Sequence, residues 1–211
     1  MSFLTSHTDR IRMKTEIHLN NFSTPSINFF VLIGLASAIA ALGLLLDNTA
    51  VVIGAMVVAP LVTPVFALAL SILLLKIKRA GKALGVIFMG TVLAVFISTI
   101  LGHLIILIEG EQFRMTSEII SRTKPNLLFF LVALCSGAAG AYAYGRPKIM
   151  ESITGIAISV AVIPPLAVVG LEMAAKNYAL ASQSFLLYLL NLAGITFGSI
   201  LMFLILGFGK E

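Results

Sequence analysis

Two proline pairs stand inside long apolar runs, and their spacing is the most distinctive feature of this sequence. Pro60 and Pro64 lie in the middle of the uncharged run 50–75, and Pro164 and Pro165 lie in tandem in a second such run. Proline lacks a backbone donor and clashes with the carbonyl one turn back, so neither run is expected to form an uninterrupted helix. Because freed carbonyls are costly in hydrocarbon, the irregular parts are expected to face the protein interior.

Interrupted helices carry their chemistry on the backbone, because free N–H groups at the start of a half-helix attract anionic or polar groups. The side chains expected nearby are neutral. The predicted substrate-binding residues are Thr63, Pro64, Pro164, Pro165 and Asn191. Two structural alternatives stay open: the prolines only bend the helices for packing, and Asn191 only ties the last helix to carbonyls around the tandem prolines.

The central turns of the apolar runs contain no Lys, Arg, Asp or Glu. Ion-coupled transporters often place a carboxylate there. A small polar or anionic solute, or a weakly held ion, therefore suits this sequence better than a proton-coupled cation. The nearest acidic residues, Asp47, Glu151 and Glu172, lie close to helix ends, where we expect solvated caps.

Catalytic and metal-binding patterns are missing from the sequence. It contains no H-E-x-x-H or G-x-S-x-G pattern, and Cys135 is its single cysteine. His103 lies near the end of an apolar run and is expected to be a packing residue. We therefore expect no enzymatic activity, no cofactor and no bound metal.

The composition is that of a membrane protein. Hydrophobic residues make up 59% of the chain and charged residues 11%, against about 25% charged in soluble domains. The net charge of +5 comes from basic residues in short segments between apolar runs. Such placement indicates orientation in a lipid bilayer and not nucleic-acid binding.

The expected fold is all-α, with an N-terminal tail at 1–26 and a transmembrane domain at 27–208. The six expected spans cover about 27–46, 50–75, 84–108, 126–144, 153 onward and 183–207, with a loop at 109–125. An even number of spans puts both termini on one side, which carries ten Lys and Arg residues against four on the other. The positive-inside rule therefore predicts a multi-pass protein of the cell (inner) membrane with both termini in the cytoplasm.

An internal repeat is indicated when the chain is shifted by 101 residues. Gly54 then meets Gly155, and Pro64 meets Pro165. The two repeats would cover about 27–108 and 126–208. Because three spans are an odd number, the repeats must have opposite orientations, the inverted-repeat arrangement common in transporters.

Small residues also follow this shift. Ala36 and Ala40 are spaced four apart in the first span, and Gly137 and Ala141 occupy the shifted positions. Such pairs let membrane helices approach closely. Together with the small size of a six-helix core, they predict a homo-oligomer, either a dimer or a trimer.

Three segments resemble signatures of the prokaryotic domain-of-unknown-function family 389. They are N-T-A-V-V-I-G-A-M-V-V-A-P-L-V-T-P-V (Asn48 to Val65), A-V-I-P-P-L-A-V-V-G (Ala161 to Gly170) and N-L-A-G-I (Asn191 to Ile195). The resemblance covers about 27–208 and departs at Val62, where many relatives are expected to have methionine. It implies an integral membrane protein of this architecture, and it implies little about activity.

The residues expected to serve structure are Asn48, Gly54, Pro60 and Gly155. Two functions remain open. One is a small transporter or channel for a small polar or anionic solute or ion, with a midplane site between the interrupted second and fifth spans. The alternative is a non-transporting membrane scaffold or assembly subunit. The first predicts water at Thr63 and Asn191, and the second predicts a dry, sealed core.

Overall fold

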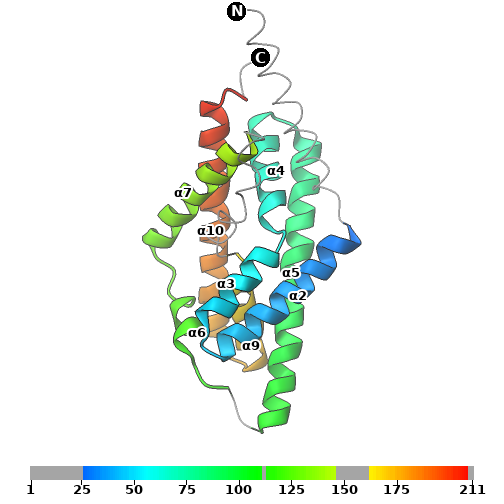
Figure 1. Cartoon of the computed structure of the whole chain (residues 1–211), viewed down its shortest axis with the longest axis vertical. Helices are drawn as coiled ribbons and strands as arrows, with labels where there is room; N and C mark the ends of the chain where they lie inside the picture. The colour runs from blue at the N-terminus through cyan, green and yellow to red at the C-terminus, as the bar shows by residue number, and fades with distance from the viewer. Residues whose placement is uncertain (1–25, 111–112, 146–161, 209–211) are drawn as a thin grey trace, which may run out of the picture.

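The computed structural model describes residues 26–110, 113–145 and 162–208, and in these ranges it is all-helical, with eight helices and no strand (Figure 1). The helices are α2 (Ile27–Leu45), α3 (Thr49–Val58), α4 (Val62–Leu73), α5 (Ile77–Glu109), α6 (Ser117–Ser121), α7 (Leu127–Tyr144), α9 (Ile163–Ala174) and α10 (Tyr178–Ile205). The predicted tail at 1–26 lies outside the described residues except for Ser26. Gly155 lies outside them as well.

Four of these helices, α2, α5, α7 and α10, are long and apolar enough to cross a membrane. The pair α3 and α4 passes the same test as one bent span, which makes five among the described residues. The predicted fifth span, from residue 153, is described only from Val162, and its described part is the shorter apolar helix α9. Large apolar side chains such as Phe88, 67% exposed, cover the outside, as a multi-pass membrane protein requires.

Helix bounds agree closely with the hydrophobic runs where a charged or polar turn ends the run. Two helices differ: α5 begins at Ile77 and not near residue 84, and α10 begins at Tyr178 and not near residue 183. The basic residues Lys78, Arg79 and Lys82, predicted to lie in a connection, occupy the first turns of α5. Lys and Arg are good helix formers. At about 1.5 Å per residue, the 33 residues of α5 reach about 50 Å, beyond a hydrocarbon core of about 30 Å.

The second apolar run is interrupted between Val58 and Val62, and the axes of α3 and α4 differ by 53°. Ala59 is extended, with ψ of 119°. This is the conformation that a residue before proline favours, and Pro60 follows it. Pro64 is the third residue of α4, where a missing N–H breaks no helical hydrogen bond. Figure 1 shows α4 running along the long axis of the molecule, with α3 lying obliquely below it.

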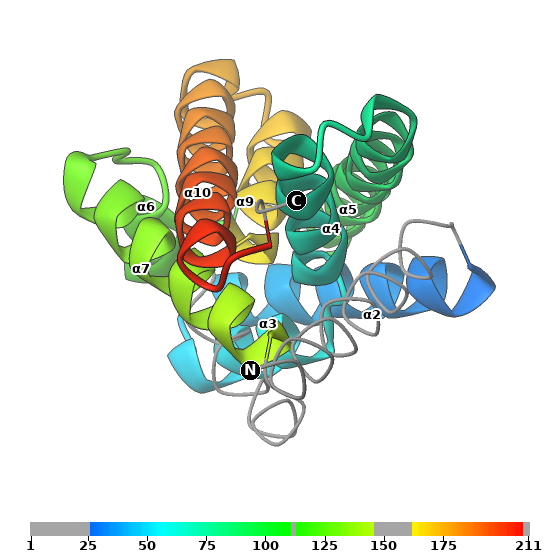
Figure 2. The same ribbon diagram turned by 90° about the horizontal axis from the view of Figure 1, so that it is seen from above.

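The short helix α9 lies at the centre of the bundle. Eleven of its twelve residues are buried. It packs against α5, α10 and α2, with a smaller contact to α3, and Figure 2 shows it between α10 and the α4–α5 pair. Pro164 and Pro165 lie in its first turn, where proline is tolerated. The part of this run that precedes Val162 lies outside the described residues.

Small residues bring helices into backbone contact, above all between α7 and α10. A Cβ added at Gly198 would overlap the carbonyl oxygen of Leu134, and one at Gly137 would overlap that of Ile195. The Ser199 hydroxyl donates to the Gly137 carbonyl oxygen at 3.1 Å. The small residues predicted for close approach, Ala36, Ala40, Gly137 and Ala141, are all buried. They serve packing within one chain.

Candidate functional site

Thr63, the first predicted site residue, lies in the first turn of α4 and is half-buried. Its hydroxyl shares a 3.1 Å hydrogen bond with the hydroxyl of Tyr144, the last residue of α7, and either oxygen can donate. The Tyr144 ring also packs against Phe66, with centroids 5.1 Å apart. These contacts hold the start of α4, just after the interruption, against the end of α7.

The tandem prolines are fastened to α10. The Ser184 hydroxyl donates a 2.9 Å hydrogen bond to the Pro165 carbonyl oxygen, and both groups are buried. This is the kind of bond that the sequence suggested for Asn191, which lies two turns further along α10 and is 4% exposed. Sequence reasoning missed Ser184, because serine is common in membrane helices and nothing in its local pattern sets it apart.

The predicted site residues thus come from three helices. Thr63 and Pro64 belong to α4, Pro164 and Pro165 to α9, and Asn191 to α10. The helix α10 packs against both α4 and α9, so it joins the two proline-bearing helices. Pro64, both tandem prolines and Asn191 are buried. The arrangement offers hydroxyl, amide and backbone groups and no formal charge.

The predicted structural residues have separate roles. The Asn48 side chain caps α3 by accepting a 3.2 Å hydrogen bond from the Val51 amide. Pro60 lies in the interruption itself. Gly54 faces open space, since a Cβ added there would meet no atom within 4 Å. Close packing among the described residues therefore does not explain this glycine.

A second hydroxyl pair lies on the face formed by α5, α9 and α10. The hydroxyls of Thr91 and Tyr188 are 2.6 Å apart. They stand at a groove of about 600 Å³ whose lining is otherwise almost entirely apolar. Phe88 and Phe96, strongly exposed, belong to this lining. The two hydroxyl residues are 97 positions apart, so no local sequence pattern could have paired them.

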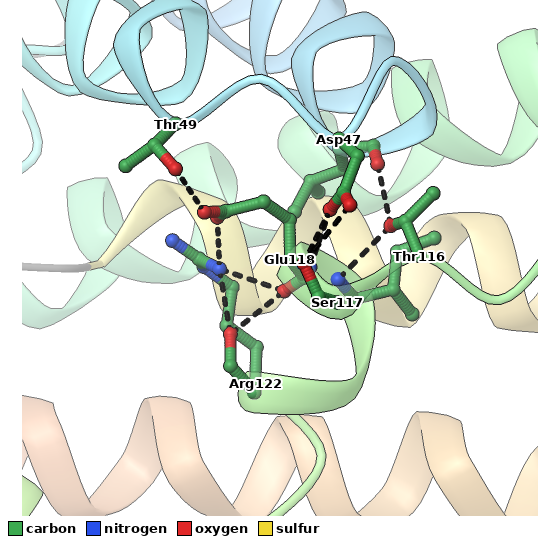
Figure 3. Close-up of polar contacts among 9 residues, drawn as sticks. Asp47, Thr49, Thr116, Ser117, Glu118 and Arg122 are labelled. Carbon is green, nitrogen blue, oxygen red and sulfur yellow. Dashed lines mark hydrogen bonds and ion pairs between the residues drawn. The ribbon is translucent and has the colours of Figure 1, made fainter.

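The predicted loop 109–125 contains the short helix α6, which is fastened to the turn between α2 and α3 (Figure 3). The carboxylate of Asp47 accepts hydrogen bonds from the Glu118 amide at 2.9 Å and from the Ser117 hydroxyl. The Thr116 hydroxyl donates to the Leu44 carbonyl oxygen at 2.7 Å and accepts from the Ile119 amide. Asp47 is solvent-exposed, as expected, and it caps a helix distant in sequence.

These hydrogen bonds set the electrostatics of the cluster. The bonds from the Glu118 amide and the Ser117 hydroxyl hold the pKa of the Asp47 carboxyl below its usual value. The Glu118 carboxylate itself accepts from the Thr49 hydroxyl and pairs with the Arg122 guanidinium. Both acidic side chains of the cluster therefore make polar contacts that hold α6 to the turn between α2 and α3.

The expectation that Glu172 lies at a solvated helix end is wrong. Its side chain is 1% exposed, because α9 is enclosed by its neighbouring helices as far as its last turn. The Asn177 side chain is hydrogen-bonded to the carboxyl group. The Oε1 atom is buried and has no hydrogen-bond partner among the described residues.

A metal site does not emerge from the described part of the chain. Within residues 26–110, 113–145 and 162–208, no group of three or more His, Cys, Asp or Glu side chains is arranged to hold an ion. Cys135 is exposed on α7, and His103 is exposed on α5 with its Nδ1 atom 3.0 Å from the Thr99 carbonyl oxygen. The expectation that the protein is not an enzyme stays a prediction.

Comparison with known proteins gives one family and one curated relative. The family model described as "Domain of unknown function (DUF389)" matches residues 56–197. "Uncharacterized protein MJ0678" of Methanocaldococcus jannaschii is 30% identical over 177 residues. The match covers 83% of this chain and 53% of the relative, so the chain spans about half of the relative's length. No solved structure matches.

Proposed function

This chain belongs to the family Domain of unknown function (DUF389), and on that premise we propose that it is a small membrane transporter or channel. Its substrate is a small polar or anionic solute or an ion, bound near the midplane between the interrupted second and fifth spans. The observation that carries the proposal is the 53° interruption of an apolar span at 59–61. Non-helical backbone at membrane depth is tolerated where it is buried in protein or lines a water-filled cavity.

Local geometry supports the proposed repeat. The helices α4 and α9 are both 12 residues long, and their bounds differ by 101 positions at each end. The next helices, α5 and α10, begin at residues 77 and 178, again 101 apart. The turns between them match as well, because Leu75 and Lys176 both have a positive φ, of 52° and 60°.

Packing partners support the same proposal. The helix α5 packs on α9, and α10 packs on α4. The contacts α4 with α5 and α2 with α5 likewise have counterparts in α9 with α10 and α7 with α10. Each of these contacts therefore maps onto another one of them when the two halves are exchanged. Two three-span halves of opposite orientation would make six spans, the sixth including residues outside the described ranges.

The chemistry of the interruption suits a polar or anionic ligand. The N-cap residue of α4 is Leu61, whose side chain cannot accept a hydrogen bond. The first amides of α4, those of Val62 and Thr63, therefore receive no capping bond from it. The positive end of a helix favours negative charge. The start of α9 is a poorer donor, since Pro164 and Pro165 have no N–H. The proposed ligand is therefore held mainly by the α4 end, with Thr63 as its hydroxyl contact.

Orientation and assembly extend the proposal. Figure 1 shows the α4–α5 connection at the same end of the molecule as the C-terminal end of α10, with α6 at the opposite end. The first end carries the basic residues Lys76, Lys78, Arg79 and Lys82. We infer a cell (inner) membrane protein with this end and both termini in the cytoplasm. A homo-oligomer, dimer or trimer, also remains our expectation.

The second candidate function, a non-transporting scaffold or assembly subunit, is favoured by one observation. The helix α9 is buried on nearly all sides, and glycines bring α7 and α10 into backbone contact. Such packing fits a sealed core. The two functions differ in whether water reaches the interruption.

Cysteine accessibility distinguishes the two. Single cysteines are placed through 59–64 and 160–165 in a Cys135→Ala background, and membranes are treated with a small water-soluble thiol reagent. We expect reaction at Thr63→Cys and at neighbouring positions of the interruption. Phe88→Cys, on the lipid-facing surface, should not react, and Lys78→Cys, on an exposed end, should react. If no position in either stretch reacts while the two controls behave as stated, the scaffold function replaces transport.

A further inference from the structure

Glu172 is an acidic side chain that lies buried in the last turn of the central helix α9. The helix that carries it is otherwise apolar from Ile163 to Ala174, and eleven of those twelve residues are buried. The position 101 residues earlier, in α4, is occupied by Ser71. In the proposed repeat, the position that matches Glu172 therefore carries no carboxylate.

The contacts of Glu172 are incomplete. Asn177 supplies one hydrogen bond to the carboxyl group. The buried Oε1 atom has no partner among the described residues. Three other acidic side chains lie at this end: Asp47 accepts several hydrogen bonds, Glu118 is paired with Arg122, and Glu109 is exposed to the surroundings.

No cationic group of the described residues neutralises Glu172. The elements packed on α9 carry few charged or titratable groups near this end. They are His103 and Glu109 on α5, Asp47 after α2, Lys176 before α10 and Tyr178 in its first turn, while α3 has none. None of them forms an ion pair with Glu172, and Arg122 on α6 pairs with Glu118. An enclosed carboxylate without a counter-charge is strongly disfavoured in its ionised form.

We propose that Glu172 is a proton-binding site, neutral in the conformation described and ionised when water reaches its Oε1 atom. The step is a reversible proton transfer from the carboxyl group to water, which changes the charge of the side chain from 0 to −1. A metal cation is a poorer occupant, because Na⁺-like and Ca²⁺-like ions need several oxygen ligands. A proton needs only the single free oxygen.

Proton binding at Glu172 would be coupled to the conformation of α9, because Glu172 lies on this proline-led helix. This part of the inference rests on the proposed transport function. Glu172 and Pro165 lie on the same short helix, and Ser184 holds that helix to α10. A charge that appears in the enclosed last turn disfavours the buried arrangement of α9. Protonation would therefore favour the conformation described, and proton release would favour one in which this end of α9 is hydrated.

Infrared difference spectroscopy on the full chain in lipid nanodiscs tests the site without any transport assay. In a pH titration the wild type should show the carbonyl band of a protonated, buried carboxyl group, which shifts in D₂O and disappears as the pH is raised. The band should be absent in Glu172→Gln and kept in the matched control Glu109→Gln, which removes an exposed carboxylate. Gel filtration reports whether each variant is folded.

The outcomes separate the two proposals. If folded wild type and folded Glu172→Gln show the same carboxyl bands throughout the pH titration, the proton site is wrong. This holds even where cysteines at the interruption react with water-soluble reagents. If the band behaves as stated but no cysteine at the interruption reacts, the proton site is supported and the proposed transport function is contradicted. A second variant, Glu172→Asp, keeps a carboxyl group on a shorter side chain and should keep a band at a shifted frequency, so a misfolded Glu172→Gln protein does not prevent a decision.

Discussion

Single side chains at the α6 end decide how the connection between α5 and α7 is held. Asp47 has a positive φ of 53° and accepts hydrogen bonds from two successive residues of α6. A non-glycine residue in this conformation is uncommon, and aspartate is among the residues that tolerate it best. The carboxylate therefore serves two purposes, ending the α2–α3 turn and capping a helix about seventy residues away.

The lowered pKa of Asp47 makes this fastening dependent on pH. A carboxyl group with a lowered pKa in the folded state contributes stability above its unfolded pKa of about 3.9, and the contribution is lost as the pH falls through the folded value. Wild type should therefore unfold at a higher temperature than Asp47→Asn at pH 7. The difference should shrink as the pH falls below about 4. Thermal unfolding in detergent at a series of pH values measures it, and a difference independent of pH would contradict the assigned hydrogen bonds.

At the scale of elements, the α7–α10 contact depends on glycine. A Cβ at Gly198 would collide with backbone and not with a flexible side chain, so α10 would have to move. We expect Gly198→Ala to destabilise the protein by about 1–3 kcal/mol or more. Gly34→Ala in α2 is the matched control, because its Cβ would meet no atom within 4 Å. Denaturant or thermal unfolding compares the two, and equal stabilities would contradict the packing described.

Hydrophobic runs and turn residues were enough to predict most helices. The starts of α2 and α7 were expected at about residues 27 and 126, and the helices begin at Ile27 and Leu127. The interruption at Pro60 was also predictable, because proline acts through local backbone geometry. The start of α5 was missed, since basic side chains were taken to end a helix when they only end its apolar part.

The contacts that sequence reasoning missed all join distant positions. The Thr91–Tyr188 and Ser184–Pro165 bonds depend on which helices pack together. The burial of Glu172 depends on the enclosure of α9 by three other helices, and this lies outside any local pattern. The helix α6 is only five residues long and is stable where Asp47 and Leu44 fasten it, so its own sequence was a weak signal.

At the scale of the whole molecule, charge predicts the orientation. Lys78 lies on the basic end and Lys124 on the opposite side of the predicted bilayer, and both are exposed. In a Cys135→Ala background, Lys124→Cys should react with an impermeant thiol reagent added outside intact cells, and Lys78→Cys should react only after the cells are opened. Reaction of position 78 but not of 124 in intact cells would reverse the assignment.

The central claim is that solute passes the interruption between α3 and α4. The most direct measurement is flux of small anions and neutral polar solutes into liposomes containing the Thr63→Cys, Cys135→Ala protein, before and after treatment with a small thiol reagent. We expect flux above that of protein-free liposomes, and we expect the reagent to block it only when the cysteine at position 63 is present. Flux equal to that of protein-free liposomes for every solute tested, with folded protein in the bilayer, would contradict transport.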